Sequence, residues 1–271
     1  MRYWDSLIEL SRCQFHNQVL SGDALSVLSD MRDGMVDMTI TSPPYNKGEQ
    51  GAVLIKAVKY ETHRDNMPEA EYQNNQIKVL NEIYRVTKSG GSCFYNHRPR
   101  WVKGKPIHPF EWLSKTKWQM RQHIIWHRKI CGNIRAWRFY QTHEEIWWLW
   151  KPNGKSPGQN QINMEQATLG SVWPIFPYKN KSVKHPCLFP PEIPARAILA
   201  TTKKGDTVLD PYVGCGTTIM AAHQLGRNYI GIDISETYAE IARKRIKVPF
   251  DGDVKKVEEE RSRVIEHDWR K

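Results

Sequence analysis

Short apolar strands that alternate with helices are the strongest constraint on how this chain can fold. Strand patterns cover six ranges, at 35–41, 92–95, 122–126, 145–150, 207–210 and 229–234. Helical patterns cover four ranges, at 68–88, 191–201, 217–225 and 236–246. Strands that alternate with helices form parallel sheets covered on both faces. The pattern therefore predicts an α/β fold with a doubly wound, mostly parallel sheet.

The first of these strands ends in an unusual turn, Ser42-Pro43-Pro44-Tyr45. Proline lacks the amide hydrogen that a sheet ladder needs and has a fixed φ, so the chain must leave the sheet in one stiff direction. The turn offers the Pro43 carbonyl, the Ser42 hydroxyl and the Tyr45 ring close together. It therefore indicates a site for a planar, polar ligand. The alternative is a turn that only ends the strand.

A second turn follows the strand at 207–210 and contains Gly214 and Gly216. Glycines let the backbone approach a ligand closely, and the amides at the start of the next helix favour polar or anionic atoms. No lysine follows the second glycine, so this is not a Walker phosphate loop. A purely structural tight turn is the alternative.

Asp233 ends the next strand, about 20 residues later, where nucleotide-binding folds place an acid on ribose hydroxyls. The glycine turn and this acid together predict an adenosine-type cofactor. The alternative for Asp233 is a cap on the helix at 236–246.

The composition restricts the partners and the compartment. The formal charge is +11 and the pI is about 9.4, which favours nucleic acid, although a merely basic surface is the alternative. The five cysteines are scattered and odd in number, which suggests neither a disulfide framework nor a metal site. The apolar run at 146–150 is too short to span a bilayer, and no signal peptide opens the chain, so we expect a cytoplasmic protein without a membrane partner.

Taken together, the two turns resemble motifs of the amino-methylating DNA methyltransferases of the restriction-modification type. The chain is similar to the class in which the catalytic motif precedes the cofactor motif. Residues 42–45 match the catalytic motif (D/N/S)PP(Y/F). Residues 210–218 match the motif DPFxGxGTT, with tyrosine in place of phenylalanine. The resemblance covers roughly residues 18–246 and includes weaker matches at Gly22-Asp23, at 144–151 and at Lys184-His185-Pro186, which looks like the family's KxHP segment.

The resemblance implies S-adenosyl-L-methionine as the cofactor, double-stranded DNA as the substrate and a target base that flips out of the helix. It implies a methyltransferase variant of the doubly wound sheet, with one antiparallel hairpin near an edge and both turns at the ends of adjacent central strands. The implied catalytic residues are Ser42, Pro43, Pro44 and Tyr45. The implied cofactor-binding residues are Asp23, Lys184, His185, Pro186, Asp210, Pro211, Tyr212, Gly214, Gly216, Thr217, Thr218 and Asp233, with no metal. Asp23 could equally cap a helix, and His185 could be a packed histidine.

The resemblance also suggests how the chain is divided. Residues 1–150 and 184–250 would form the methyltransferase domain, and the aperiodic segment 151–183 would be a target-recognition insertion. Residues 251–271 would be a charged C-terminal tail. The polar segment 46–66 would form a mobile loop over the site. A separate cognate restriction endonuclease and a homodimer are possible partners in such systems.

The first residue of the catalytic motif favours one target base over the other. Family members with serine there mostly resemble cytosine-N4 enzymes, so Ser42 favours cytosine, with adenine-N6 as the alternative. Cytosine-C5 chemistry needs a nucleophilic thiolate, but the one Pro-Cys pair, at Cys187, falls inside another matched motif. A more remote alternative is a catalytically silent DNA-binding protein, suggested by the aromatic and basic segment 126–138. Core packing is the competing interpretation for the tryptophans at 147, 148 and 150.

Overall fold

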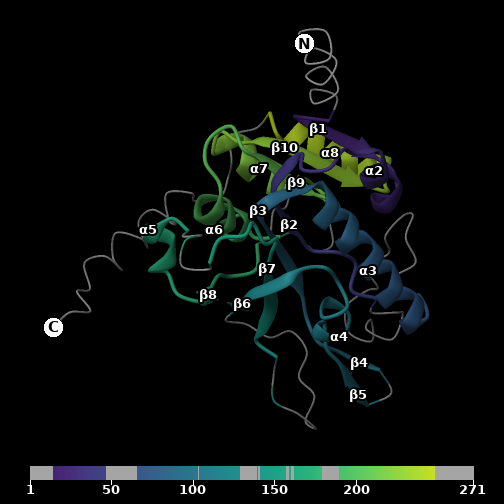
Figure 1. Cartoon of the computed structure of the whole chain (residues 1–271). Coiled ribbons are helices and arrows are strands. Elements are labelled where there is room, and N and C mark those ends of the chain that lie inside the picture. Colours follow the sequence, from purple (N-terminus) through teal and green to yellow (C-terminus); the bar gives the residue numbers. More distant parts are fainter. Residues whose placement is uncertain are drawn as a thin grey trace, which may run out of the picture.

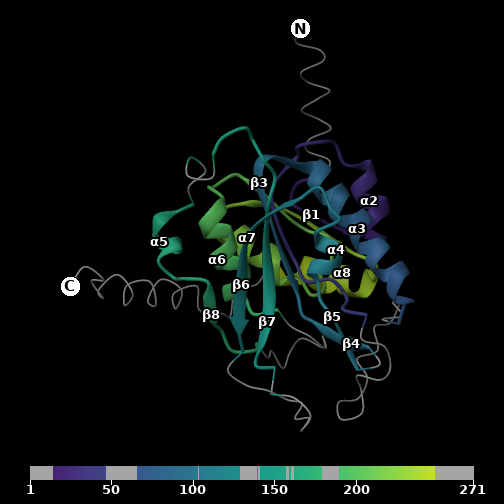
Figure 2. The same ribbon diagram turned by 60° about the horizontal axis from the view of Figure 1, so that its bottom comes forward.

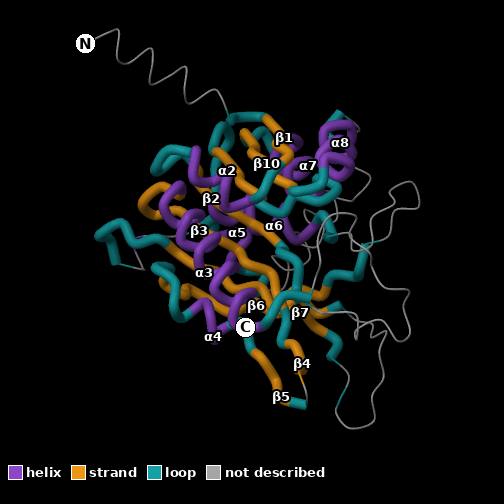
Figure 3. Tube along the Cα trace, turned by 90° about the vertical axis from the view of Figure 1, so that its right-hand side faces the viewer, coloured by secondary structure: helices purple, strands orange, loops and turns teal. Residues whose placement is uncertain are grey.

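The computed structural model describes residues 15–46, 66–102, 104–128, 141–156, 162–178 and 189–247, together with Phe139 and Gln159. Its centre is an eight-stranded sheet with the order β1-β10-β9-β2-β3-β7-β6-β8 (Figure 1). The strands of this sheet are β1 (Gln18–Ser21), β2 (Val36–Thr41), β3 (Thr87–His97), β6 (Gln119–His127), β7 (His143–Trp150), β8 (Val172–Pro174), β9 (Thr207–Asp210) and β10 (Asn228–Asp233). A separate two-stranded hairpin pairs β4 (Arg100–Val102) with β5 (Lys105–Ile107) and extends away from the main sheet (Figure 3).

The helices cover both faces of the sheet. They are α2 (Ala24–Asp30), α3 (Glu69–Val86), α4 (Phe110–Leu113), α5 (Met164–Ala167), α6 (Glu192–Thr201), α7 (Thr217–Gln224) and α8 (Glu236–Arg245). One buried cluster joins the sheet to α2, α3 and α4, and the other joins it to α6, α7 and α8. Figure 2 shows α2, α3 and α4 on one side of the strands and α6 and α7 on the other, and Figure 3 shows α8 on the side of α6 and α7. The predicted doubly wound α/β architecture is therefore confirmed.

The direction of the strands also agrees with the expectation. Five adjacent strands, β1, β10, β9, β2 and β3, run parallel to one another. Strand β7, by contrast, is antiparallel to both β3 and β6. The β6–β7 hairpin is thus the antiparallel element that the resemblance implied. The sequence patterns did not identify the short strands β1 and β8, which lie at the two edges of the sheet.

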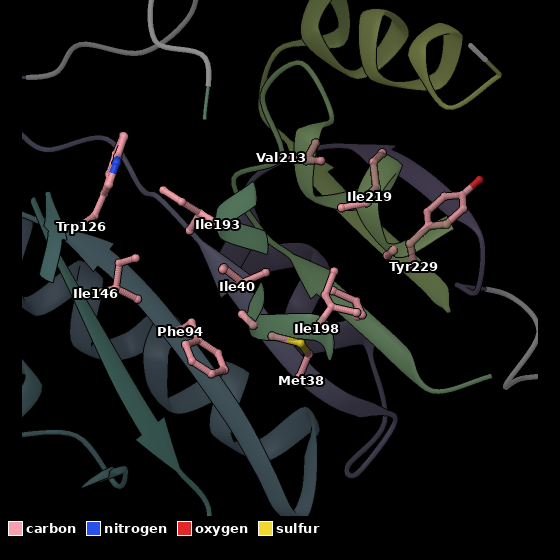
Figure 4. Close-up of a cluster of buried hydrophobic side chains, with 14 of the residues drawn as sticks. Met38, Ile40, Phe94, Trp126, Ile146, Ile193, Ile198, Val213, Ile219 and Tyr229 are labelled. Atoms are coloured by element: carbon pink, nitrogen blue, oxygen red, sulfur yellow. The ribbon is translucent and has the colours of Figure 1, made fainter. Parts of the chain in front are cut away.

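Alternation along the strands decides which face each side chain packs on. In β2, Met38 and Ile40 point to the same face, where Figure 4 shows them near Ile193 and Ile198 of α6. Phe94 of β3 belongs to the same cluster, whereas its neighbour Tyr95 packs on the opposite face. This is the two-residue period of a strand that is buried on both sides.

Helix α3 differs from its sequence pattern at the C-terminal end. Glu69 and Glu71 lie in its first turn, where their charges are stabilised by the positive end of the helix dipole. The sequence pattern extended the helix over 68–88, but it ends at Val86, and Gly90 and Gly91 lie inside β3. At Gly91, a Cβ atom would approach the Asp37 carbonyl oxygen to 2.7 Å, so the glycine allows close contact with the neighbouring strand.

The aperiodic segment 151–183 contributes directly to the core. It contains β8, which pairs in parallel with β6, and α5, which packs on α6. Trp173 and Ile175 are buried in the cluster that contains α6, and the Trp126 indole donates to the Ile175 carbonyl oxygen at 2.8 Å. Its predicted role in target recognition, and the predicted division into domains, stay predictions. The predicted tail, residues 251–271, lies outside the described residues.

The tryptophans of β7 pack as the core interpretation predicted. Trp147, Trp148 and Trp150 are all at most 7% exposed. Among the helices that the structure describes, none is both long and apolar enough to cross a membrane.

Candidate active site

The two predicted ligand turns lie side by side. Strands β2 and β9 pair in parallel, with Thr39 opposite Leu209, so both turns leave the sheet on the same side, at the carboxyl ends of these central strands. A hydrogen bond from Thr41 Oγ1 to Asp210 Oδ1, 2.8 Å long, joins the last residues of the two strands. The expectation that both turns follow adjacent central strands is confirmed. Open α/β sheets bind ligands at the carboxyl ends of their strands, which is where these turns lie.

The Ser42-Pro43-Pro44-Tyr45 turn, named the catalytic turn after its predicted role, is held by a hydrogen-bond network around the Tyr45 hydroxyl. Tyr45 is only 8% exposed, and its hydroxyl donates to Glu144 Oε2 at 2.9 Å. Because that proton is used on Glu144, Ser42 Oγ, 3.0 Å away, donates its own hydrogen to Tyr45. Asn96 Nδ2 donates to the same hydroxyl oxygen and to Glu144 Oε2, the latter at 3.2 Å. Asn96 Nδ2 also donates to Ser42 Oγ at 3.3 Å, so one lone pair of Ser42 remains as an acceptor.

Charge and burial keep this network in one protonation state. Arg128 Nη1 donates to Glu144 Oε1 at 2.9 Å and balances the buried carboxylate. Burial, and then the neighbouring Glu144 charge, raise the pKa of Tyr45 well above its usual value. Tyr45 is therefore a neutral hydrogen-bond donor at physiological pH.

Asn96 was not among the predicted site residues. It lies near the end of β3, beside β2, and is 1% exposed. Within the described part of the chain, its Oδ1 is buried and has no hydrogen-bond partner. A buried acceptor that is left open is unfavourable unless a ligand uses it. A polar residue directly after the predicted strand at 92–95 was the available sequence signal, because it lies at the same edge of the sheet as Ser42.

Glu144 was noted only as part of a weaker motif match. Its neighbour Glu145 points to the other face of β7, where its carboxylate approaches His108 Nε2 at 3.3 Å. The two-residue period of a strand thus divides the Glu144-Glu145 pair between two surroundings. Only Glu144 belongs to the network around the catalytic turn.

The glycine turn forms a tight cradle before α7. Gly214 and Gly216 have φ angles of +51° and +88°, which favour glycine over residues with a side chain. A Cβ atom on Gly216 would lie 2.9 Å from the Ala242 Cα atom of α8. Helix α7 begins directly afterwards, at Thr217. The turn places the first amides of α7 at the carboxyl ends of β2 and β9, and its role in binding the cofactor stays a prediction.

Asp210 is a buried carboxylate surrounded by uncharged hydrogen-bond donors. It accepts hydrogen bonds from Thr41, from Thr218 and from the Tyr212 amide. Burial raises the pKa of Asp210 to about 6, although these hydrogen bonds lower it. A carboxylate in this position suits a cationic ligand such as a sulfonium or an ammonium group. S-adenosyl-L-methionine carries both.

Asp233 connects the glycine turn to the next strand. Its Oδ2 accepts from the Gly214 amide and its Oδ1 from the Ser235 amide, both at 2.9 Å. The N-cap of α8 is Ser235, so the helix-cap alternative for Asp233 is wrong. Asp23, at the end of the neighbouring β1, does cap a helix, because its Oδ1 accepts from the Ser26 amide of α2 at 2.9 Å.

The remaining predicted residues divide into two groups. Pro211 and Tyr212 follow Asp210 within the cofactor turn, and burial raises the pKa of the Tyr212 hydroxyl. Lys184, His185 and Pro186 lie outside the described residues, as does most of the predicted loop over the site. The two ends of that loop are close, since Asn46 Nδ2 donates to the Met67 carbonyl oxygen at 2.9 Å.

A doubly wound sheet with a glycine turn, a strand-end acid and a Ser-Pro-Pro-Tyr turn at one edge defines a methyltransferase that acts on an amino group. The family model for DNA methylase (N6_N4_Mtase) matches residues 36–244, and the chain belongs to this family. The protein is accordingly a DNA amino-methyltransferase, and S-adenosyl-L-methionine is its methyl donor.

The curated relatives include type II methyltransferases. The chain is 28% identical to the type II methyltransferase M.BglII of Bacillus subtilis, an alignment that covers 84% of this chain and 68% of the relative. It is also 28% identical to the type II methyltransferase M.HpaI of Haemophilus parainfluenzae, over 87% of this chain and 76% of the relative.

Solved structures share the fold. The PvuII cytosine-N4-specific DNA methyltransferase has a TM-score of 0.67 at 17% identity and covers 92% of both chains. The protein TTHA0409 of Thermus thermophilus was solved in complex with S-adenosyl-L-methionine. Its TM-score is 0.63 at 24% identity, over 85% of this chain and 93% of that one. At these identities the similarity is one of architecture.

Proposed function

We propose that this protein methylates the N4 amine of a cytosine that is flipped out of double-stranded DNA. The observation that carries the proposal is the Ser42 hydroxyl, which donates to Tyr45, accepts from Asn96 and so presents one acceptor lone pair and no hydrogen to a substrate. Adenine-N6 is the alternative, because the same acceptors could receive an adenine amine.

An exocyclic amine is a poor nucleophile because its lone pair is delocalised into the ring. Acceptors that hold the two amine hydrogens favour a pyramidal nitrogen with a localised lone pair. Ser42 Oγ and the Pro43 carbonyl are the acceptors that the motif provides. The open, buried Asn96 Oδ1 is a third acceptor at the same turn. In this proposal the chain binds and orients the amine and forms no covalent bond with it.

The proposed base-binding surface is the ring of Tyr45. Aromatic rings stack on flipped bases, and the network at the Tyr45 hydroxyl fixes the orientation of this ring. Trp126, by contrast, is part of the core, so we do not assign it a DNA contact.

For the cofactor, we assign the glycine turn, Asp210 and Asp233 to binding. When bound, S-adenosyl-L-methionine supplies an electrophilic methyl group. Asp210 would balance its positive charge, and Asp233 would accept from ribose hydroxyls while it holds the Gly214 amide. Lys184, His185 and Pro186 remain predicted cofactor-binding residues. Asp23 also remains one, in addition to its role as a helix cap.

Several further predictions accompany this proposal. Residues 151–183 would recognise the target sequence, and a separate restriction endonuclease would cleave the same sequence when it is unmethylated. A homodimer and a cytoplasmic location are the remaining predictions.

The test is mass-resolved nucleoside analysis of mixed-sequence duplex DNA after incubation with the protein and S-adenosyl-L-methionine. The control is the Ser42→Ala, Tyr45→Ala double variant, with cofactor affinity measured in parallel. N4-methylcytosine that disappears with the double variant supports the proposal. N6-methyladenine would overturn the cytosine assignment and keep the assigned site, whereas equal loss of cofactor binding in the double variant would overturn the division into two sites.

A further inference from the structure

Two buried residues without a role in the chemistry above hold the backbone of the catalytic turn. Tyr72 of α3 is 3% exposed, and His97, the last residue of β3, is fully buried. The Tyr72 hydroxyl donates to the Pro44 carbonyl oxygen at 2.8 Å. The same hydroxyl lies 2.8 Å from His97 Nε2. A helix and a neighbouring strand therefore meet at the backbone of the turn.

The directions of these hydrogen bonds follow from the atoms involved. A carbonyl oxygen can only accept, so the single hydroxyl hydrogen of Tyr72 is used on Pro44. His97 must then donate from Nε2 to the Tyr72 oxygen. In a neutral ring, Nδ1 is an acceptor, and it lies 2.9 Å from the Arg98 amide nitrogen. The Arg98 carbonyl oxygen, 2.8 Å from Nδ1, would be bonded only by a ring protonated on both nitrogens. Either way, Nε2 carries a hydrogen.

This chain of hydrogen bonds restricts the ψ angle of Pro44, which determines where Tyr45 lies. The rings of Pro43 and Pro44 fix φ at both positions, so the ψ angle of Pro44 decides where its carbonyl oxygen points and where Tyr45 begins. Tyr72 fixes that oxygen. The Tyr45 hydroxyl is held at the other end by Asn96 and Glu144. The ring proposed to stack on the base is thus fixed at its backbone and at its tip.

Packing around the imidazole keeps the donor in place. The His97 ring lies 4.4 Å from the Tyr45 ring, and the Trp112 ring meets His97 edge to face at 5.0 Å. Tyr95 stacks on His97 at 5.8 Å, with a 6° angle between the rings. These neighbours leave the imidazole little freedom to turn away from Tyr72.

We propose that His97 and Tyr72 are positioning residues for methyl transfer, acting through a directed chain from His97 Nε2 to the Tyr72 hydroxyl to the Pro44 carbonyl. The proposal rests on the proposed function, since it assigns these residues to the orientation of Tyr45 and of the Pro43 carbonyl. It predicts an effect on turnover that is separate from cofactor binding.

The first test compares Tyr72→Phe, His97→Phe and the double variant in steady-state methyl transfer to duplex DNA. Tyr72→Phe keeps the ring and removes only the hydroxyl. We expect kcat to fall about 10- to 100-fold, because small misplacements of reacting groups have effects of this size. Cofactor Kd should stay close to that of the wild type, and Tm should fall by only a few degrees because a buried hydrogen bond is lost. The matched control is Tyr84→Phe, on the same helix, where the ring packs on Trp118 away from the turn.

The double variant tests whether the two residues act as one chain. If they do, the double variant loses no more turnover than the more damaged single variant, because the interaction is already broken. Losses that multiply would overturn the proposed chain. The proposal also fails if Tyr72→Phe keeps kcat within about twofold of the Tyr84→Phe control, or if kcat, cofactor affinity and Tm all fall together.

A second measurement does not depend on activity. The ¹⁵N resonances of His97, assigned by their loss in His97→Phe, report which ring nitrogen carries hydrogen. Hydrogen on Nε2 supports the proposal, and a ring with hydrogen on Nδ1 alone overturns it. If the wild type methylates DNA while His97 lacks the Nε2 hydrogen, the positioning chain fails and the proposed function stands. If no DNA is methylated while the Nε2 hydrogen is present, the proposed function fails and the geometry of the chain stands.

Discussion

Thr41 and Asp210 connect β2 to β9 through one buried hydrogen bond, 2.8 Å from Oγ1 to Oδ1. Both residues are the last of their strands, β2 and β9, and each is followed by a ligand turn. The bond therefore fixes the distance between the turn that we propose holds the amine and the turn that we propose binds the methyl donor.

Thr41→Val should test how much this bond stabilises the fold. Loss of a hydrogen bond to a buried carboxylate is expected to lower the free energy of unfolding by about 1.5–3 kcal/mol. Thr39→Val is a matched control on the same strand, because Thr39 is equally buried and its Oγ1 has no hydrogen-bond partner within the described residues. Urea unfolding should show a loss for Thr41→Val and little change or a gain for Thr39→Val. Equal losses would contradict the assignment.

The raised pKa of Asp210 predicts how stability depends on pH. In the folded protein this pKa is about 6, against an ordinary value of 3.8, so the folded state binds the proton more tightly than the unfolded state. The stabilisation from this proton is complete below pH 4 and is lost as the pH rises through 6, a total of about 3 kcal/mol. Without cofactor, Asp210→Asn should remove this slope between pH 4 and 7. Denaturant titrations at several pH values would measure it, and parallel curves for both proteins would disprove the link.

The fold and the two turns could be predicted from sequence because their signals are local. A strand pattern, a proline pair or a glycine turn is contained within a few neighbouring residues, and the periodicity of α6, α7 and α8 predicted them to within a residue or two. The aperiodic segment that contains β8 has no such signal, since its three-residue strand forms only against β6.

The partners of the catalytic turn could not be predicted in the same way. Glu144 reaches Tyr45 across 99 positions in the sequence, and Asn96 across 51. These contacts depend on the pairing of β3 with β7, in which Asn96 lies opposite Ile146. Tyr72 was assigned no role because a tyrosine on the buried face of a helix is typical of a residue that packs in the core. Its hydroxyl acquires a partner only when the helix packs over the turn.

The Tyr45 hydroxyl should matter for turnover more than for substrate affinity. Tyr45→Phe keeps the ring that would stack on the base but leaves Ser42, Asn96 and Glu144 without their shared partner. We expect kcat to fall about 10- to 100-fold and the Kd values for DNA and cofactor to change little. Tyr45→Ala should in addition weaken DNA binding, because the stacking surface is gone. Steady-state kinetics with filter binding separates the two, and equal DNA affinities for both variants would contradict a stacking role.

Gly216 should tolerate no side chain, for two separable reasons. Its φ of +88° is strained for alanine, at about 1–2 kcal/mol, and the new Cβ atom would lie 2.9 Å from backbone and side-chain atoms of Ala242. Helix α8 would have to shift, which adds about 1–3 kcal/mol of overpacking.

Gly205 is the matched control, because its φ is +85° but no atom lies within 4 Å of a Cβ there. We expect Gly205→Ala to show only the backbone cost with unchanged cofactor affinity, and Gly216→Ala to show both costs and weaker cofactor binding. Calorimetry with S-adenosyl-L-methionine and urea unfolding would measure both effects. Identical behaviour of the two variants would show that close packing of the turn on α8 does not shape the cofactor site.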